Sequence, residues 1–159
     1  LATVQKVIQN LLRERVSIRD SVGVLEALGE SGAMTKNPVL LTEYVRQAIR
    51  RLLVRPYLNH AGELPALFLD PQIEQSIEGA IEHHEQSSHL NLAPRKLRDI
   101  LDKVARAVGA NETPMAAVTS SSARFFLRQM VEGTLPNLAV LSHNEIPTGV
   151  RVISLGLIQ

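Results

Sequence analysis

The sequence contains no cysteine, and this absence excludes a disulfide scaffold, a thiolate metal site and a cysteine nucleophile. Tryptophan is also absent, and aromatic residues make up 3% of the chain, which disfavours the platforms on which nucleic-acid bases stack. The 17 basic and 16 acidic residues give a net charge of +1, so the basic excess typical of nucleic-acid-binding proteins is missing. We therefore expect no nucleic-acid partner.

Long hydrophobic runs are missing as well. No apolar run approaches the roughly 18 residues that a membrane-spanning helix needs, and no signal peptide is visible. The chain begins at Leu1 with a helical pattern almost at once, and we interpret it as a piece of a longer protein. A chain of this size buries roughly 70% of its unfolded surface, so one domain or two small ones can form a core without disulfides.

Residues 4–20 combine an amphipathic helix, a sharp break and the start of a second helix. The apolar stripe of the first helix consists of Val4, Ile8, Leu11 and Leu12. Ser17 and Asp20 have the spacing of a capping box with Asp in place of Glu, which predicts a second helix over residues 18–28. We expect its inward face to consist of Ile18, Val22, Leu25 and Leu28. Gly23 weakens this helix and predicts a close helix crossing.

A third helix has the clearest start signal in the chain. Asn37 is a good N-cap, Pro38 is a good first-turn residue, and Pro56 closes the helix. Four arginines crowd its C-terminal half, namely Arg46, Arg50, Arg51 and Arg55. They form either a patch for an acidic partner or a solvated helix end that suits the helix dipole, and we favour the second interpretation.

The pattern changes after residue 58, where strands begin to alternate with helices. The expected elements are strands at 64–69, 115–119, 138–141 and 150–157, helices at 71–85, 94–108 and 120–133, a polar loop at 86–92 and a turn at 111–114. Strands separated by helices indicate a partly parallel sheet, and the short loop between the last two strands favours antiparallel pairing there. The predicted fold class is α+β: an all-helical subdomain over residues 1–58, a linker at 59–64, and a small α/β subdomain over 65–159 with a roughly four-stranded mixed sheet.

Histidines near residue 85 invite a metal interpretation. His83, His84 and His89 lie beside Glu82 and Glu85, but no histidine pair has the i, i+4 spacing that places two ligands on one helix face. We therefore interpret them as solvated side chains and expect no metal site.

Three other polar residues each follow a predicted strand. Asp70, Ser120 and His143 would meet at the carboxyl edge of a parallel sheet, so a Ser–His–Asp hydrolase is one alternative. The G-x-S-x-G nucleophile elbow is missing, however, and N-capping explains Asp70 and Ser120. No nucleotide-binding glycine motif occurs. A helix-turn-helix reader is also disfavoured, because Arg19 is the only basic residue of its recognition helix.

Three ordered stretches give the chain a family resemblance: VIQNLLRERVSIRD, LLTEYVRQAIRR and LPNLAVLSHNEIP. They resemble the C-terminal cytoplasmic region of the type III export-gate proteins, the FlhA/InvA/LcrD family, and the match runs over nearly all of the chain. The EYVRQ and NEIP segments are more similar to the flagellar branch than to the virulence branch.

The resemblance implies a non-enzymatic function without a cofactor. Family members have a membrane domain and four cytoplasmic subdomains, and these assemble into a nine-fold ring at the cytoplasmic face of the bacterial inner membrane. The implied partners are other copies of the parent protein, export chaperone–substrate complexes and export-apparatus proteins. This chain would hold the third and fourth subdomains, and its parent would reach the membrane only through an N-terminal region. The alternative is a small α/β hydrolase-like or ligand-binding domain with a helical cap.

The turn after the first helix carries five charges of both signs within eight residues. They belong to Arg13, Glu14, Arg15, Arg19 and Asp20. Mixed charges set specificity and register at interfaces, so we predict that these residues contact a neighbouring subunit. The competing explanation is capping and pairing within the chain, which we slightly favour for Asp20.

Overall fold

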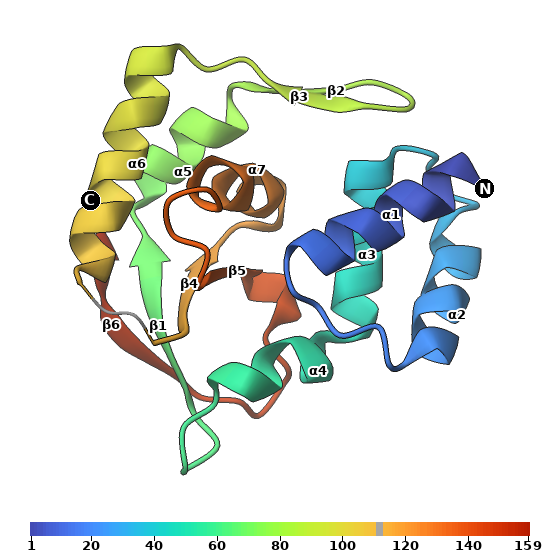
Figure 1. Ribbon diagram of the computed structural model, residues 1–159, viewed down its shortest axis with the longest axis horizontal. Coiled ribbons are helices and arrows are strands. Elements are labelled where there is room, and N and C mark those ends of the chain that lie inside the picture. The colour runs from blue at the N-terminus through green and yellow to red at the C-terminus, as the bar shows by residue number, and fades with distance from the viewer. Residues whose placement is uncertain (111–112) are drawn as a thin grey trace.

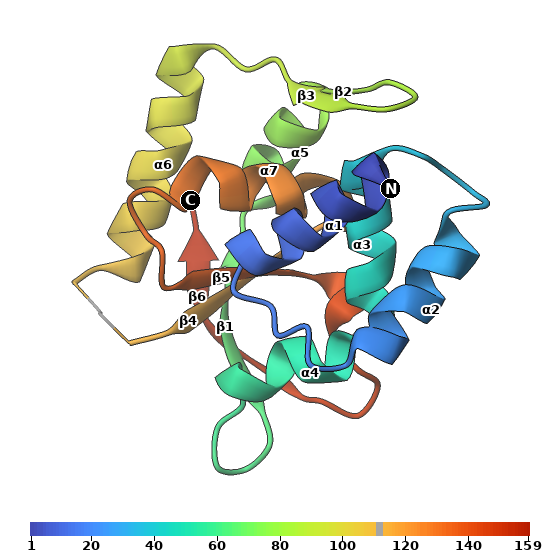
Figure 2. The same ribbon diagram turned by 45° about the vertical axis from the view of Figure 1, so that its right-hand side comes forward.

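The structure is a computed structural model that describes residues 1–110 and 113–159. Its first part is helical. The elements are α1 (Ala2–Arg13), α2 (Ser21–Ser31), α3 (Pro38–Ala48), α4 (Arg50–Val54) and the 3-10 turn η1 (Arg55–Tyr57). In Figures 1 and 2, α1 lies beside α3 and α2 packs on the outer side of α3.

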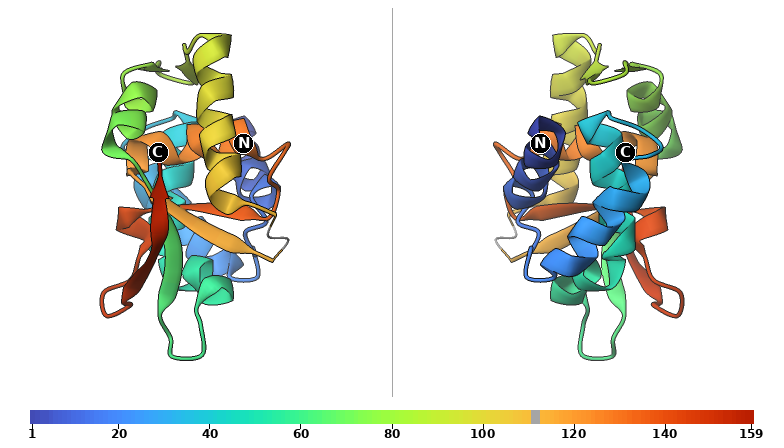
Figure 3. Two further views of the ribbon diagram at one scale, coloured as in Figure 1. Left: turned by 90° about the vertical axis from the view of Figure 1, so that its left-hand side faces the viewer. Right: turned by 90° about the vertical axis from the view of Figure 1, so that its right-hand side faces the viewer.

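The second part alternates strands with helices. Its elements are β1 (Leu64–Leu69), α5 (Pro71–Glu78), β2 (Ile81–His83), β3 (Ser88–Leu90), α6 (Pro94–Val108), β4 (Met115–Thr119), α7 (Ser121–Val131), β5 (Leu138–Ser142), η2 (His143–Glu145) and β6 (Val152–Ile158). Four strands form one sheet in the order β5-β4-β1-β6, and every pair in it is parallel. Figure 3 shows β6 beside β1 at one side of this sheet. The predicted turn at 111–114 lies partly outside the described residues.

The sheet separates two hydrophobic cores. Successive side chains of a strand point to opposite faces, so Leu64 and Ala66 join one core while Leu67 and Leu69 join the other. The helical part packs into the first core, and α5, α6 and α7 pack into the second. The helices end at Tyr57 and β1 begins after a short loop, yet the two parts share the first core. The division into two subdomains stays a prediction.

The start of α2 differs from the predicted capping box. Asp20, not Ser17, is the N-cap, and its carboxylate accepts a hydrogen bond of 3.0 Å from the backbone N of Gly23. The hydroxyl of Ser17 accepts a bond from the backbone N of Arg19 instead. A Cβ at Gly23 would overlap the carboxylate of Asp20. The close approach that requires glycine is therefore made by the cap and not by a helix crossing.

The third helix is shorter than its pattern predicts. Ile49, with φ −108° and ψ 24°, ends α3, and the chain continues as α4 and η1. Ile49 is buried, and so are Leu53 and Val54 beyond it. Packing these residues against the sheet overrides the helical pattern, a common outcome because propensity is a weak prior.

The predicted helix over 71–85 is wrong in its second half. It ends at Glu78 with Gly79 as its cap, and the chain then forms the antiparallel hairpin β2–β3. The side-chain nitrogen of Asn37 donates hydrogen bonds of 2.9 Å to the backbone oxygens of His84 and Ser87 in this hairpin. The contact joins residues far apart in sequence, so no local pattern contains it.

The antiparallel pairing predicted for the last two strands is also wrong. β6 crosses to the far side of β1 and pairs with it in parallel. The antiparallel pairing in the described residues belongs to the separate hairpin. The α+β class and the four-stranded sheet are confirmed. No helix within 1–110 or 113–159 has the length and apolar character to cross a bilayer.

We expect Asn37→Ala to lower the free energy of unfolding by about 2–3 kcal/mol, because it removes both the cap of α3 and the hairpin bonds. Asn37→Asp keeps the oxygen that accepts from Val39 N but turns the donor into a carboxylate oxygen that faces two carbonyls. It should therefore be no more stable than the alanine variant. Urea unfolding measures both, with exposed Asn144→Ala as the control. Wild-type stability of Asn37→Asp would contradict the role of the hairpin bonds.

Candidate subunit-contact site

The predicted contact residues begin at the C-terminal end of α1. Arg15 N donates to Leu12 O at 2.9 Å and Val16 N donates to Leu11 O at 3.0 Å, which is the Schellman pattern. The motif requires a left-handed residue, and Arg15 occupies it with φ 62°. This conformation costs a residue with a Cβ roughly 1–2 kcal/mol. The turn sends the side chain of Glu14 inward and leaves Arg15 exposed.

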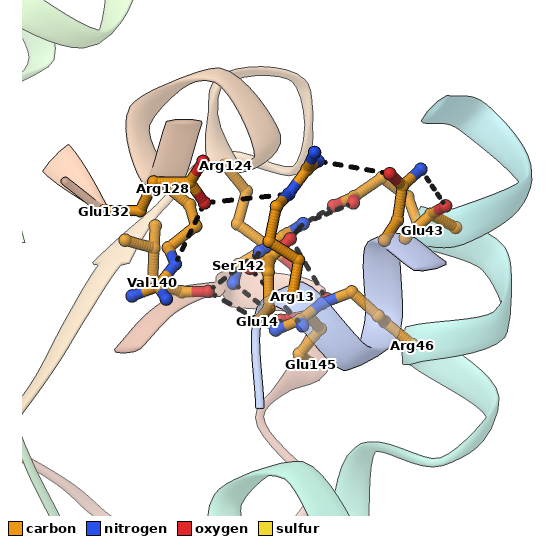
Figure 4. Close-up of polar contacts among 12 residues, drawn as sticks. Arg13, Glu14, Glu43, Arg46, Arg124, Arg128, Glu132, Val140, Ser142 and Glu145 are labelled. Atoms are coloured by element: carbon orange, nitrogen blue, oxygen red, sulfur yellow. Dashed lines mark hydrogen bonds and ion pairs between the residues drawn. The ribbon is translucent and has the colours of Figure 1, made fainter. Parts of the chain in front are cut away.

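Glu14 belongs to a buried charge network centred on Arg124 of α7. The guanidinium of Arg124 is fully buried and donates to both carboxylate oxygens of Glu14, at 2.6 and 2.8 Å. It also donates to both oxygens of Glu43 on α3, at 2.7 and 2.8 Å. A fifth bond of 3.1 Å reaches the carbonyl of Val140 in β5. One side chain therefore joins α1, α3, α7 and the edge strand of the sheet (Figure 4).

A second arginine extends this network. Arg46 of α3 donates to Glu145 through two bonds of 2.7 and 3.0 Å, and its guanidinium lies 3.7 Å from Glu14. It also donates to the carbonyl of Val140. Glu145 accepts a further bond from the backbone N of Ser142. Arg46 is thus a buried residue and not part of a solvated helix end, whereas the three arginines that follow it are exposed.

The network holds three carboxylates and two guanidiniums, and their side chains are at most 11% exposed. Burial disfavours the charged form of Glu14, but Arg124 and Arg46 outweigh it and hold the pKa of this carboxyl below its usual value. Burial dominates at Glu43 and, together with the charge of Glu145, raises its pKa despite Arg124. Burial also disfavours the charged form of Arg124. The charges of Glu43 and Glu14 outweigh this effect and raise the pKa of Arg124 well above its usual value.

The five predicted contact residues have different surroundings. Arg13 is half-exposed, lies 5.7 Å from the ring centroid of Phe125 and pairs with Glu132 at 3.7 Å. Arg15 and Arg19 are exposed, and exposed Asp20 caps α2. Glu14 is enclosed by the arginines described above, so the surface-accessible members are Arg13, Arg15, Arg19 and Asp20. Their contact with a neighbouring subunit stays a prediction.

Two large apolar side chains are exposed on the outer face of α2, beside Glu26 and Glu30, and this was not predicted. Val22 and Leu25 are 65% and 59% exposed, and Ile18 just before the helix is 39% exposed. The expected inward face is wrong for these three residues, because α2 begins three residues later and turns Val24 and Leu28 toward the core. Exposed apolar side chains that share a helix face make that face a candidate for contact with another protein.

The hydrolase alternative fails on geometry. Asp70 caps α5 by accepting from Gln72 N at 3.2 Å, and Ser120 caps α7 by accepting from Ala123 N at 3.1 Å. The ring of His143 stacks on Phe68 with centroids 6.5 Å apart. No hydrogen bond among the described residues joins Asp70, Ser120 and His143 into a triad. Each side chain has a structural partner of its own instead.

The histidines lie on the β2–β3 hairpin and not on a helix. His83 bonds to the hydroxyl of Ser88 at 2.6 Å, and the rings of His84 and His89 are 5.7 Å apart. Across residues 1–110 and 113–159, no group of three or more His, Asp or Glu side chains has the arrangement to hold a metal ion.

Comparison with known proteins gives one consistent family. The model of the FHIPEP family matches residues 1–151. The flagellar biosynthesis protein FlhA of Caulobacter vibrioides is 35% identical over 160 residues, which cover 98% of this chain and 23% of the relative. Invasion protein InvA of Salmonella typhimurium is 32% identical over 151 residues, which cover 91% of this chain and 22% of the relative. The chain spans about a quarter of the length of its curated relatives.

Solved structures of similar proteins share the fold over nearly the whole chain. The Chlamydia pneumoniae CdsV protein matches with a TM-score of 0.91 and 31% identity, covering 99% of this chain and 46% of that chain. The nonameric EPEC SctV-C matches with a TM-score of 0.87 and 27% identity, and the match covers 98% of this chain and 47% of that chain. CdsV in its complex with CdsO matches with a TM-score of 0.88 and 31% identity, and the match covers 99% of this chain and 47% of that chain.

We expect Arg124→Met to lower the free energy of unfolding by about 3–5 kcal/mol, because the substitution leaves Glu14 and Glu43 buried without their main partner. The matched control is Arg106→Met on the exposed face of α6, which should change stability by no more than about 0.5 kcal/mol. Urea unfolding followed by circular dichroism measures both variants. Equal stability of the two would contradict the central role of Arg124.

The pKa of Glu14 is lowered and that of Glu43 is raised, so their contributions to folding stability should change with pH in opposite directions. The folded-state pKa of Glu14 is lowered, so its stabilising effect is present above its ordinary pKa of 4.5 and is lost as the pH falls through the folded value. The stability difference between wild type and Glu14→Gln should therefore grow with pH. The folded-state pKa of Glu43 is raised, so the contribution of Glu43 is lost as the pH rises through that value.

The stability difference between wild type and Glu43→Gln should consequently shrink as the pH rises. Urea unfolding between about pH 3 and pH 7 measures both trends, and the two variants serve as controls for each other. Parallel pH profiles would show that the shifts do not have these signs.

Proposed function

Because this chain belongs to the FHIPEP family, we propose that it is the cytoplasmic part of a bacterial type III protein-export gate. It works there as a non-enzymatic subunit of an oligomeric platform. The observation that carries the proposal is the exposed apolar face of α2 beside the charged loop of Arg15 and Arg19. A face of this kind needs a protein neighbour, and the similar SctV-C domain is nonameric.

Other copies of the parent protein are the first proposed partners. Apolar residues of α2 supply the burial at the subunit contact, and the exposed charges of the loop set its register. Arg19 suits this role, because its side chain makes no hydrogen bond or ion pair with any residue that the structure describes. Arg13 suits it less, because its guanidinium already pairs with Glu132.

The platform helps to receive export chaperone–substrate complexes and other proteins of the export apparatus. The complex of CdsV with CdsO, in which the similar chain binds a second kind of protein, supports this part of the proposal. The site of action is the cytoplasmic face of the inner membrane, and the parent reaches the bilayer through a region outside this chain. The preference for the flagellar branch stays a prediction, because FlhA and InvA relatives match at 35% and 32% identity.

A non-enzymatic role fits the geometry better than the hydrolase alternative. The candidate triad is divided among two helix caps and a ring stack, so its hydroxyl lacks a neighbouring base. The buried charges pair with one another and hold elements together. What this chain offers to other molecules is its exterior.

We expect the double substitution Val22→Asp with Leu25→Asp to prevent ring assembly of the complete cytoplasmic region, because it places two charges in an apolar contact. The stability of the isolated chain should change little, since both side chains are exposed. Analytical ultracentrifugation and electron microscopy measure the assembly. Leu155→Asp, at a similarly exposed apolar position on β6, is the control and should leave the ring intact.

The same assay includes Arg19→Glu, which reverses a loop charge without breaking a contact inside the chain. Rings of normal stability in this variant would remove the charged loop from the proposed contact. Rings of normal stability in the double α2 variant would remove the helix face as well.

A further inference from the structure

A small pocket lies at the seam between the helical part and the sheet. Its volume is about 100 Å³, and its walls come from the α1–α2 linker, from α4 and η1, and from the edge strand β5. One wall is apolar and includes Leu52, Leu53 and Tyr57. The lining also includes three arginines, Arg15, Arg46 and Arg128, and one acidic residue, Glu14. The pocket therefore combines an apolar surface with a concentration of positive charge.

Arg128 of α7 has donors that nothing in the described chain uses. It is 5% exposed, and its Nη1 donates to the carbonyls of Pro136 and Leu138 at 3.3 and 2.8 Å. Its buried Nε has no hydrogen-bond partner among the described residues. Glu132 is its ion-pair partner within the helix, at a distance of 4.0 Å. A buried guanidinium donor without a partner is costly unless water or a ligand satisfies it.

Arg15 brings a second positive charge to the same place. Its Nη1 donates to the side-chain oxygen of Asn137 at 2.9 Å, and Asn137 lies between the two residues whose carbonyls hold Arg128. Burial lowers the pKa of Arg128 although Glu14 and Glu132 act to raise it, and the like charge of Arg15 adds to the lowering. Arg15 also occupies a left-handed backbone position that suits glycine. Strain of this kind is often kept where a side chain has a functional task.

Glu14, the acidic residue in the pocket wall, attracts the charge of Arg128 but is itself held by another arginine. Both carboxylate oxygens of Glu14 accept hydrogen bonds from Arg124, at 2.6 and 2.8 Å. Arg46, which also lines the pocket, is held by both oxygens of Glu145. Arg15 and Arg128 thus remain the cations of the pocket that are not bound by both oxygens of a carboxylate.

We propose that this pocket binds an acidic side chain from a partner protein, with the carboxylate on Arg128 and Arg15 and a neighbouring apolar side chain against Leu53 and Tyr57. Guanidiniums recognise carboxylates through paired, charge-assisted hydrogen bonds, and a low-dielectric wall strengthens them. The apolar wall favours a peptide segment over a free inorganic anion, because an ion cannot use that surface. This inference goes beyond the proposed ring function: it shares Arg15 with the charged loop but uses no residue of α2.

The test uses the complete 159-residue chain and two blocked dipeptides. Acetyl-Leu-Glu-amide carries the carboxylate, and acetyl-Leu-Gln-amide is its uncharged counterpart of the same shape. Titration followed by NMR of the arginine Nε–Hε signals should show saturable shifts at Arg128 and Arg15 with the glutamate dipeptide. Binding of the glutamine dipeptide should be weaker by about tenfold or more, as expected for the loss of a charged hydrogen bond.

Two variants separate binding from folding. Arg15→Gly removes one guanidinium but suits the left-handed backbone, so its melting temperature should not fall below that of the wild type while its affinity for the glutamate dipeptide drops several-fold. Arg19→Gln, in the same loop but outside the pocket wall, is the matched control and should bind as the wild type does.

Equal binding of both dipeptides, unchanged affinity of Arg15→Gly, or inorganic phosphate that binds as tightly as the glutamate dipeptide would each overturn the proposal. Ring assembly of the complete cytoplasmic region is measured separately, so a failure of the ring function does not alter these results.

Discussion

The guanidinium of Arg124 is the interaction on which the rest of the structure depends. It is fully buried and holds two carboxylates and one backbone carbonyl, so the end of α1, the middle of α3 and the edge strand β5 all meet on one side chain of α7. Desolvating these charges costs as much as their pairing returns, so the network contributes little net stability. What it does is set one arrangement, because any other leaves a buried charge unpaired.

This arrangement also protects the edge of the sheet. Strand β5 is an edge strand, and the carbonyl of Val140 accepts hydrogen bonds from both Arg124 and Arg46. An unpaired strand edge invites pairing with other chains, and the two arginines, one from α7 and one from α3, lower that risk at Val140. The same contacts fix the helical part to the sheet. The outer face of α2 and the loop after α1 are consequently held at fixed positions relative to the sheet.

Sequence reasoning found the elements whose signals are local. The caps at Asn37, Asp70 and Ser120 are confirmed, and so are the four strands of the sheet. It missed the β2–β3 hairpin, because a distant amide from Asn37 holds the hairpin turn. It also placed Arg46 in solvent, since a run of arginines at a helix end carries no sign of which one is buried. A signal for the network did exist: the three stretches that carry the family resemblance contain Glu14, Glu43, Arg46 and Glu145.

By itself the sequence determined the α+β class, the absence of cysteine chemistry, the helix caps and the family, because composition, periodicity and motifs are properties of neighbouring residues. Only the tertiary structure decided which charges are buried, which face of α2 is exposed and where β6 pairs. Those outcomes depend on partners that lie far apart in the chain. Arg124 and Glu14, for example, are 110 positions apart, and nothing near either residue indicates the other.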